Sequence, residues 1–446
     1  MSQHFSVGHL LRYTSPSIAM MIFASVYIIV DGLFVSNFIG ATALAAVNFV
    51  YPIPMILATV GFMLGTGGSA VVAKTLGEGR PDKANEYFSL IVYAAIVFGV
   101  SCSAIGLAVL KPVLAALGAS GNLLDASVLY GTILLLGIPG FVLQYAFQSL
   151  VMTAGKPKLG FISTLVAGCL NIGLDALFII VFGWGLAGAA WASIIGMAAG
   201  GIVPLIYFAR KNTSLLKLGK TKLELRILGK SAVNGSSEMV SNIAMSVVSI
   251  VYNVQLLHLI GESGVAAYGV IQYVAMIFAA VFMGYSMGAG PLMSFQYGAR
   301  NTQEMRSLLQ KGLGIIGVFG ILMFLATRVL ADPLAYMYVG YDQDLYGLTA
   351  HALKLYSMAF LIMGFNIYGS SFFTALNNGL VSAIISFLRT FVFEIGSVLL
   401  LPQLIGIDGI WYSVGVAEIA ALIITLSFIF ALGSTYGYRP QKSDTN

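Results

Sequence analysis

The sequence predicts an all-α integral membrane protein, with twelve transmembrane helices in two six-helix lobes related by a pseudo-two-fold axis along the membrane normal. Three observations predict this fold class: the composition, a series of long apolar segments, and an internal repeat. Hydrophobic residues make up 59% of the chain and charged residues 9%, with a mean hydropathy of +0.93. Soluble domains carry about 25% charged residues, so this chain has too little charge to cover a water-facing surface.

The apolar segments are long enough to cross a bilayer, which takes about 20 helical residues. Hydropathy and loop punctuation predict helices over residues 13–38, 46–74, 87–115, 126–154, 159–182, 186–209, 229–258, 263–297, 306–330, 349–375, 378–405 and 409–435. One long polar and basic segment divides the chain almost in half. We therefore expect four regions: an N-lobe over 1–209, a basic linker over 210–228, a C-lobe over 229–435 and a tail over 436–446.

The basic residues of the loops indicate the orientation. If the N-terminus is cytoplasmic, only Lys111, Arg328 and Lys354 fall outside, as the positive-inside rule expects. We expect a multi-pass protein of the cell inner membrane with both termini in the cytoplasm. The net charge of +5 is spread over these loops, so we expect the lipid bilayer, and no nucleic acid, as a partner.

The two halves of the chain repeat each other. Gly67 and Gly288 are 221 residues apart, and the same offset relates Gly77 to Gly298. It also relates Ile39-Gly40 to Ile260-Gly261, Thr153-Ala154 to Thr374-Ala375, Gly185 to Gly406 and Gly188 to Gly409. A single ungapped offset through six helices argues against chance, even among 51 glycines. Two copies of six spans point the same way across the membrane, with a binding site expected between them.

Several carboxylates lie inside the apolar segments, where an ionised side chain costs about 2.5–3.5 kcal/mol on insertion scales. In the first half these are Asp31 and Asp175. The helical rise places Asp31 roughly 27 Å and Asp175 about 24 Å from the cytoplasmic ends of their helices. Ser193 comes to a similar depth, and Asn171, four residues before Asp175, shares its helix face. The sequence therefore predicts a polar cluster in the outer half of the first lobe.

The cluster offers hard oxygen ligands and two nearby carboxylates. Burial and like-charge repulsion both favour the protonated form of a carboxyl group. Such a site can take up a proton, or hold Na⁺ between Asp31, Asn171 and Asp175. The alternative is a polar knot that joins three helices by hydrogen bonds. We favour the ion site, because amide side chains would join the helices without the cost of a charge.

The second half carries Glu238, Arg389, Glu394 and Glu418 at middle depth. Buried charges tend to pair, so we expect Arg389 to neutralise Glu394 or Glu418. Glu238 has no basic residue at its depth in its own helix, and we expect it to contact a cationic substrate or a proton. Pro16 is either a hinge of the first helix or an ordinary first-turn proline.

No catalytic constellation is apparent. The four histidines form no metal-binding pair, and no phosphate-binding glycine loop is found. We therefore expect no enzyme activity and no cofactor. A channel is another possible function, but a channel does not need a buried pair of protonatable carboxylates in one of its lobes.

Several motifs together resemble the multidrug and toxic compound extrusion (MATE) family, in particular its bacterial multidrug-export branch. They are Val30-Asp31-Gly-Leu-Phe within the first helix, Gly77-Glu-Gly-Arg80 with its counterpart Tyr297-Gly-Ala-Arg300, and Thr153-Ala-Gly-Lys-Pro157. The resemblance covers essentially the whole chain.

The resemblance implies a monomeric secondary active antiporter that exports cationic and amphiphilic small molecules in exchange for H⁺ or Na⁺ by alternating access. It places cation coupling on Asp31, Asn171, Asp175 and Ser193, with Tyr27 and Gln148 as neighbours. Family members often have threonine and asparagine at the positions of Ser193 and Gln148.

For the second lobe, the resemblance matches Glu238 to a carboxylate that some branches pair with an aspartate. This chain has no acid in the corresponding segment, 373–379. The alternative function is a lipid-linked oligosaccharide flippase of the same superfamily. Such proteins often have two further spans and a basic cavity, whereas Arg389 is the sole mid-membrane base here.

Overall fold

The computed structural model describes residues 5–39, 46–47, 50–117 and 119–438, without the side chains of 32–37. Across these ranges the chain forms helices joined by short connections, and no strand occurs in them. The all-α prediction is confirmed. Gly40 of the predicted repeat and residues 439–446 of the predicted tail lie outside the described residues.

The first half of the chain forms one helical bundle, the N-lobe. Its helices are α1 (Val7–Phe38), α3 (Pro52–Gly77), α4 (Pro81–Ala116), α5 (Gly121–Leu136), α6 (Ile138–Thr153), α7 (Pro157–Asp175) with the π-helical turn η1 (Ala176–Val181), and α8 (Gly185–Ala209). The predicted helix 126–154 is in fact two helices, α5 and α6, bent by 52°. The bend falls at Gly137, where Pro139 removes a helical N–H group.

The second half forms the C-lobe. Its helices are α9 (Leu225–Leu259), α10 (Glu262–Gly298), α11 (Thr302–Val339), α12 (Gln343–Tyr356), the 3₁₀ turn η2 (Ser357–Ala359), α13 (Phe360–Ala375), α14 (Gly379–Phe387), the π-helical turn η3 (Leu388–Glu394), α15 (Ile395–Ile405) and α16 (Asp408–Ala431). Over the described residues of both lobes, 11 helical segments are long and apolar enough to span a membrane, or 12 when the bent pair α5–α6 counts as one span.

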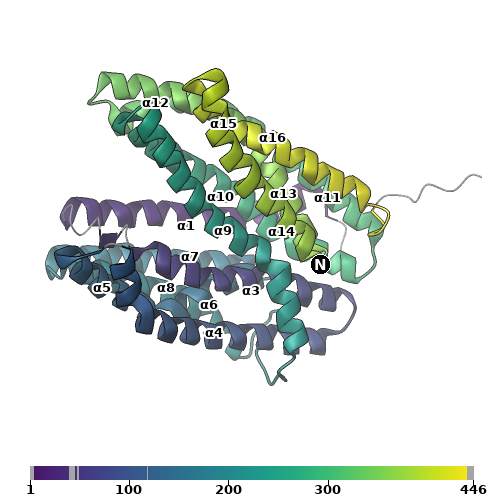
Figure 1. The fold of residues 1–446 in the computed structure, drawn as a ribbon. Coiled ribbons are helices and arrows are strands. Elements are labelled where there is room, and N and C mark those ends of the chain that lie inside the picture. Colours follow the sequence, from purple (N-terminus) through teal and green to yellow (C-terminus); the bar gives the residue numbers. More distant parts are fainter. Residues whose placement is uncertain (1–4, 40–45, 48–49, 118, 439–446) are drawn as a thin grey trace, which may run out of the picture.

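The two lobes lie against each other at one end and diverge toward the other (Figure 1). We call the end with the N-terminus and the 210–224 connection the linker end. The main contacts between lobes join α1 to α10 and α3 to α9. Because the repeat relates α1 to α9 and α3 to α10, these two contacts are equivalent to each other under the pseudo-two-fold axis.

Two glycines of the repeat make this interface symmetric at the linker end. A Cβ atom on Gly77 would lie 2.0 Å from the Phe295 carbonyl oxygen, and one on Gly298 would lie 2.0 Å from the Lys74 carbonyl oxygen. Lys74 and Phe295 are themselves 221 residues apart. Only glycine permits backbones to approach this closely, so both copies of the residue are needed for the lobes to meet.

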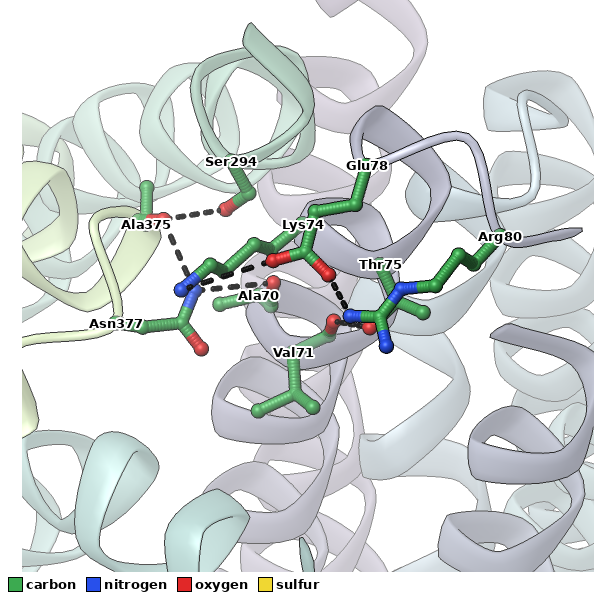
Figure 2. Close-up of polar contacts among 9 residues, drawn as sticks. All are labelled: Ala70, Val71, Lys74, Thr75, Glu78, Arg80, Ser294, Ala375 and Asn377. Carbon is green, nitrogen blue, oxygen red and sulfur yellow. Dashed lines mark hydrogen bonds and ion pairs between the residues drawn. The ribbon is translucent and has the colours of Figure 1, made fainter. Parts of the chain in front are cut away.

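Polar contacts add to this seam, and Figure 2 shows several of them. The Asn377 side-chain amide of the C-lobe donates to the Ala70 carbonyl of α3 at 3.2 Å. The Lys74 ammonium lies 4.8 Å from the centroid of the Tyr297 ring, across the interface. Glu78 forms ion pairs with Lys74, at 3.9 Å, and with Arg80. The Gly77–Arg80 loop motif is therefore part of the inter-lobe contact.

Pro16 lies inside α1, which begins at Val7. The first-turn interpretation of this proline is wrong, because the helix starts earlier than the hydropathy suggests. Proline has no N–H group, so the Arg12 carbonyl loses its helical hydrogen bond. That carbonyl accepts a hydrogen bond from the Ser15 hydroxyl at 3.1 Å instead. The hinge interpretation stays a prediction.

Candidate functional site

The structure brings the predicted N-lobe carboxylates together. Asp31 of α1, Asn171 of α7 and Ser193 of α8 line one small cavity, and Asp175 lies beside Asp31. Asp175 is completely buried at the end of α7. The π-helical turn η1 follows it directly, and such turns are frequent at functional sites. Three helices therefore converge on one acidic cluster.

Several oxygen atoms of the cluster have no hydrogen-bond donor. Neither carboxylate oxygen of Asp175 has a partner among the described residues, and the same holds for one oxygen of Asp31 and for the Asn171 side-chain oxygen. Buried polar atoms are normally hydrogen-bonded, and an unsatisfied group costs about 1–3 kcal/mol or more when charged. A proton or a cation would supply what these oxygens lack.

A small cavity adjoins the carboxylates. It is lined by Tyr27, Asp31, Tyr51, Asn171, Ser193 and Met197, among others, and has a volume of about 30 Å³. Asp175 is buried beside this cavity and does not line it. A cavity needs roughly 10–15 Å³ by this measure to hold one water molecule. The site therefore has room for water or a monatomic ion, and none for an organic substrate.

The neighbouring residues are only partly those predicted. Tyr27 lines the cavity, and its hydroxyl lies 3.8 Å from the Met197 sulfur. Gln148 is buried in α6 but does not line the cavity. Gln144, one turn earlier on the same face, also lacks partners for its amide in the described part of the chain. Sequence reasoning missed Tyr51 and Met197, which line the cavity.

The C-lobe charges form a bonded pair. Arg389 of η3 donates from Nε and Nη2 to one oxygen of Glu418 on α16, at 2.8 and 2.6 Å. The other Glu418 oxygen accepts from the Asn366 amide at 2.6 Å, and Asn366 accepts from Thr425 at 2.9 Å. The Glu418 side chain is 3% exposed. Of the two predicted partners of Arg389, the structure pairs it with Glu418. The guanidinium is therefore engaged in this pair, whereas a lipid-linked oligosaccharide flippase would need it to contact a pyrophosphate.

Two C-lobe carboxylates stay outside this pair. Glu394, the last residue of η3, and Glu238, on α9, are both half-buried. In the described ranges, neither side chain makes a hydrogen bond or an ion pair. The four acidic and basic residues predicted for the second half are therefore divided between one closed network and two separate acids.

Comparisons with known proteins place the chain in a family of membrane transporters. The MatE family model matches residues 16–177 and again 239–399. The chain belongs to the MatE family, and the double match agrees with its internal repeat.

The curated relatives are similar over nearly their whole length. The chain is 22% identical to the multidrug export protein MepA of Staphylococcus aureus (strain MSSA476), over 95% of this chain and 93% of the relative. It is 23% identical to the MepA protein of Staphylococcus haemolyticus (strain JCSC1435), with the same coverage.

Solved structures share the fold. One is a MATE protein in complex with MaL6, with a TM-score of 0.91 and 21% identity over 96% of this chain and 97% of that chain. Another is the outward-facing conformation of a multidrug resistance MATE family transporter, with a TM-score of 0.90 and 21% identity over 96% of both chains. The predicted two-lobe membrane fold is confirmed.

Proposed function

We propose that this protein is a multidrug efflux antiporter that exports cationic and amphiphilic small molecules in exchange for H⁺ or Na⁺. The export of drugs is suggested by the name of the MepA relatives. We further propose that it acts as a monomer in the inner membrane, with the linker end in the cytoplasm. The described arrangement, closed at the linker end, is then an outward-facing one, in keeping with its similarity to a transporter described in that state.

One observation supports the coupling site above all others: Asp175 is completely buried beside the half-buried Asp31, and the Asp175 oxygens have no donor among the described residues. A structural knot would satisfy these groups with hydrogen bonds, whereas both Asp175 oxygens are left without one in the described part of the chain. Asp31, Asn171 and Asp175 are the ligands we assign to Na⁺, if Na⁺ is the coupling ion. The 30 Å³ cavity is of the size for an ion, so the substrate must bind elsewhere, between the lobes.

Coupling requires that ion and substrate favour different arrangements of the lobes, since equal affinity for both would shift neither. An ion at the pair removes the repulsion between the two carboxylates and draws α1 toward α7. α1 also contacts α10 of the other lobe. Occupation of the site therefore acts on a helix that forms part of the inter-lobe interface.

The test uses inside-out vesicles with an acidic lumen or, separately, a sodium-loaded lumen, and follows ethidium uptake by fluorescence. We expect one of the two gradients to drive uptake, and Asp31→Asn and Asp175→Asn each to abolish it. Asp125→Asn removes an exposed N-lobe carboxylate and serves as the matched control. Undiminished uptake by both variants, at wild-type protein levels, would reject the assignment.

A further inference from the structure

The connection between α8 and α9 is bound to the surface of the N-lobe. Its residues 215–222, which we call the strap, lie against α4 on the side of the N-lobe that faces away from the C-lobe (Figure 1). The Asn85 side chain of α4 accepts a hydrogen bond from the Lys217 N–H group at 2.8 Å. One turn further along α4, the Ser89 hydroxyl accepts from the Gly219 N–H group at 3.0 Å. The strap is therefore held by its backbone, which leaves its long side chains available.

The strap buries two leucines and exposes its lysines. Leu216 is completely buried, and Leu218 packs against the same N-lobe core. Lys217, Lys220 and Lys222 are all exposed. None of these three ammonium groups forms an ion pair with any residue that the structure describes. The strap thus presents three positive charges on a backbone that is fixed to α4.

The charge around the strap is almost entirely of one sign. Residues 210–230 include seven basic residues and a single acid, Glu224. Glu224 lies 3.9 Å from the Lys83 ammonium of α4. A cluster of about four to eight basic residues next to a membrane span is typical of binding to anionic lipid headgroups.

The position of the strap along α4 is that of the headgroup layer. Farther along α4, Val97 is 63% and Val100 is 53% exposed, and in a membrane span such apolar side chains face lipid. Tyr93, whose hydroxyl donates to the strap backbone at 3.2 Å, precedes Val97 by four residues, about 6 Å of helix. Ser89 precedes it by eight, about 12 Å. The headgroup layer is roughly 5–8 Å thick on each side of the hydrocarbon core. The strap therefore starts at the edge of the hydrocarbon and passes through this layer.

Exposed leucines flank the lysines. Leu215 is 50%, Leu223 is 73% and Leu225 is 71% exposed. At a membrane interface, such side chains enter the boundary between headgroups and acyl chains while neighbouring basic residues meet the lipid phosphates. A free anion would engage the lysines alone and would leave these leucines in water. The combination of charge and apolar surface therefore favours a lipid bilayer as the partner.

We propose that the strap is a binding site for anionic phospholipid headgroups. Lys217, Lys220 and Lys222 contact the phosphate groups, and the flanking leucines enter the apolar edge of the bilayer. Because α4 holds the strap, the bound lipid is attached to the N-lobe. This inference goes beyond the proposed antiport function, and its test does not depend on transport.

The experiment measures lipid association directly. The purified full-length protein is reconstituted in phosphatidylcholine vesicles that contain spin-labelled phosphatidylglycerol or, separately, spin-labelled phosphatidylcholine. The motionally restricted fraction of each labelled lipid gives their relative affinity for the protein. We expect the wild type to prefer phosphatidylglycerol, with a contribution of about fivefold or less from each strap lysine. The triple variant Lys217→Gln, Lys220→Gln, Lys222→Gln should lose most of this preference, and an unchanged preference would overturn the proposal.

A matched control removes three exposed basic residues elsewhere, through Lys111→Gln, Arg300→Gln and Arg306→Gln. This variant loses the same charge as the strap variant and should keep the wild-type preference for phosphatidylglycerol. Equal losses in the two variants would show that the total charge of the protein selects the lipid, which would contradict a site at the strap.

A charge-neutral variant tests whether the strap must be held in place. Asn85→Ala combined with Ser89→Ala removes two side chains that bind the strap backbone and leaves every lysine present. The preference for phosphatidylglycerol should fall, because the lysines are no longer fixed at the level of the headgroups. Ser101→Ala, at an exposed position of the same helix, should behave as wild type. An undiminished preference in the double variant would overturn the role of the bound strap.

Inorganic phosphate distinguishes a lipid site from a site for free anions. Chloride is replaced by phosphate at constant ionic strength, so that the screening of charges stays the same. The lipid preference of the wild type should not change. Displacement of the labelled phosphatidylglycerol by phosphate would assign the strap to free anions and would reject the bilayer as its partner.

Discussion

The two lobes have the same fold, but the acidic residues inside the N-lobe are not paired with a base among the described residues, whereas Glu418 inside the C-lobe is. In the N-lobe, Asp31 and Asp175 lie together, with no basic residue bonded to either in the described structure. In the C-lobe, Arg389 and Glu418 are bonded to each other, and Asn366 completes the network. A paired charge contributes to the fold, whereas an unpaired one is a cost that function must explain. If the proposed antiport function is right, the difference between the lobes separates a structural ion pair from an ion-coupling site.

The largest expected effect comes from breaking the C-lobe pair. Glu418→Leu leaves the Arg389 guanidinium in the lobe without its partner. Removal of one member of a buried ion pair costs about 3–5 kcal/mol. We expect a clear fall in the thermal unfolding temperature of the purified protein in detergent.

Two further variants sharpen the comparison between the lobes. Arg389→Met combined with Glu418→Leu should recover most of the lost stability, because no unpaired charge is left. Asp175→Asn in the N-lobe should leave the unfolding temperature unchanged or higher, since it removes a carboxylate that has no donor. If Asp175→Asn is as destabilising as Glu418→Leu, both centres are structural and the contrast fails.

A smaller effect is expected at the seam, where the lobes are alike. In Gly298→Ala the new Cβ would lie 2.0 Å from the Lys74 carbonyl oxygen, so the lobes must move apart at the linker end. Overpacking of this kind costs about 1–3 kcal/mol. Spin labels at the exposed positions Asp82 and Gln303, one in each lobe, should report a longer distance.

The matched control for the seam is Gly269→Ala in the same helix, α10. Nothing lies within 4 Å of a Cβ atom at that position. The spin-label distance should then stay at its wild-type value. Equal distances in the Gly298→Ala and Gly269→Ala variants would show that the close approach does not control the separation of the lobes.

The smallest effect is expected for substitution of Glu238, which tests whether this C-lobe carboxylate interacts with the positive charge of the substrate. Half-exposed charge interactions are worth about 1 kcal/mol or less. Glu238→Gln should therefore change the relative export of dications and monocations by about fivefold or less, with stability unaffected. Vesicle uptake of matched dyes measures this ratio, and an unchanged ratio would remove Glu238 from the substrate path.

Much of the fold was predictable because its signals are local. Long apolar segments mark spans wherever they occur, and the 221-residue offset related the lobes before any contact was known. Counting along two helices predicted a similar depth for Asp31 and Asp175, although α1 begins at Val7, earlier than the count assumed. The break at Gly137 was missed although Pro139 stood beside it, since a composition window averages over a bend.

The sequence by itself determined the membrane class, the number of spans, the repeat, and the acids that lie too deep for lipid. Only the tertiary structure decided that Arg389 belongs to Glu418, that Glu394 stays apart, and that Tyr51 and Met197 join Asp31 around a cavity. The physical reason is distance. Hydropathy depends on a contiguous segment, whereas the partner of a buried charge depends on which remote helices come within about 3 Å of it.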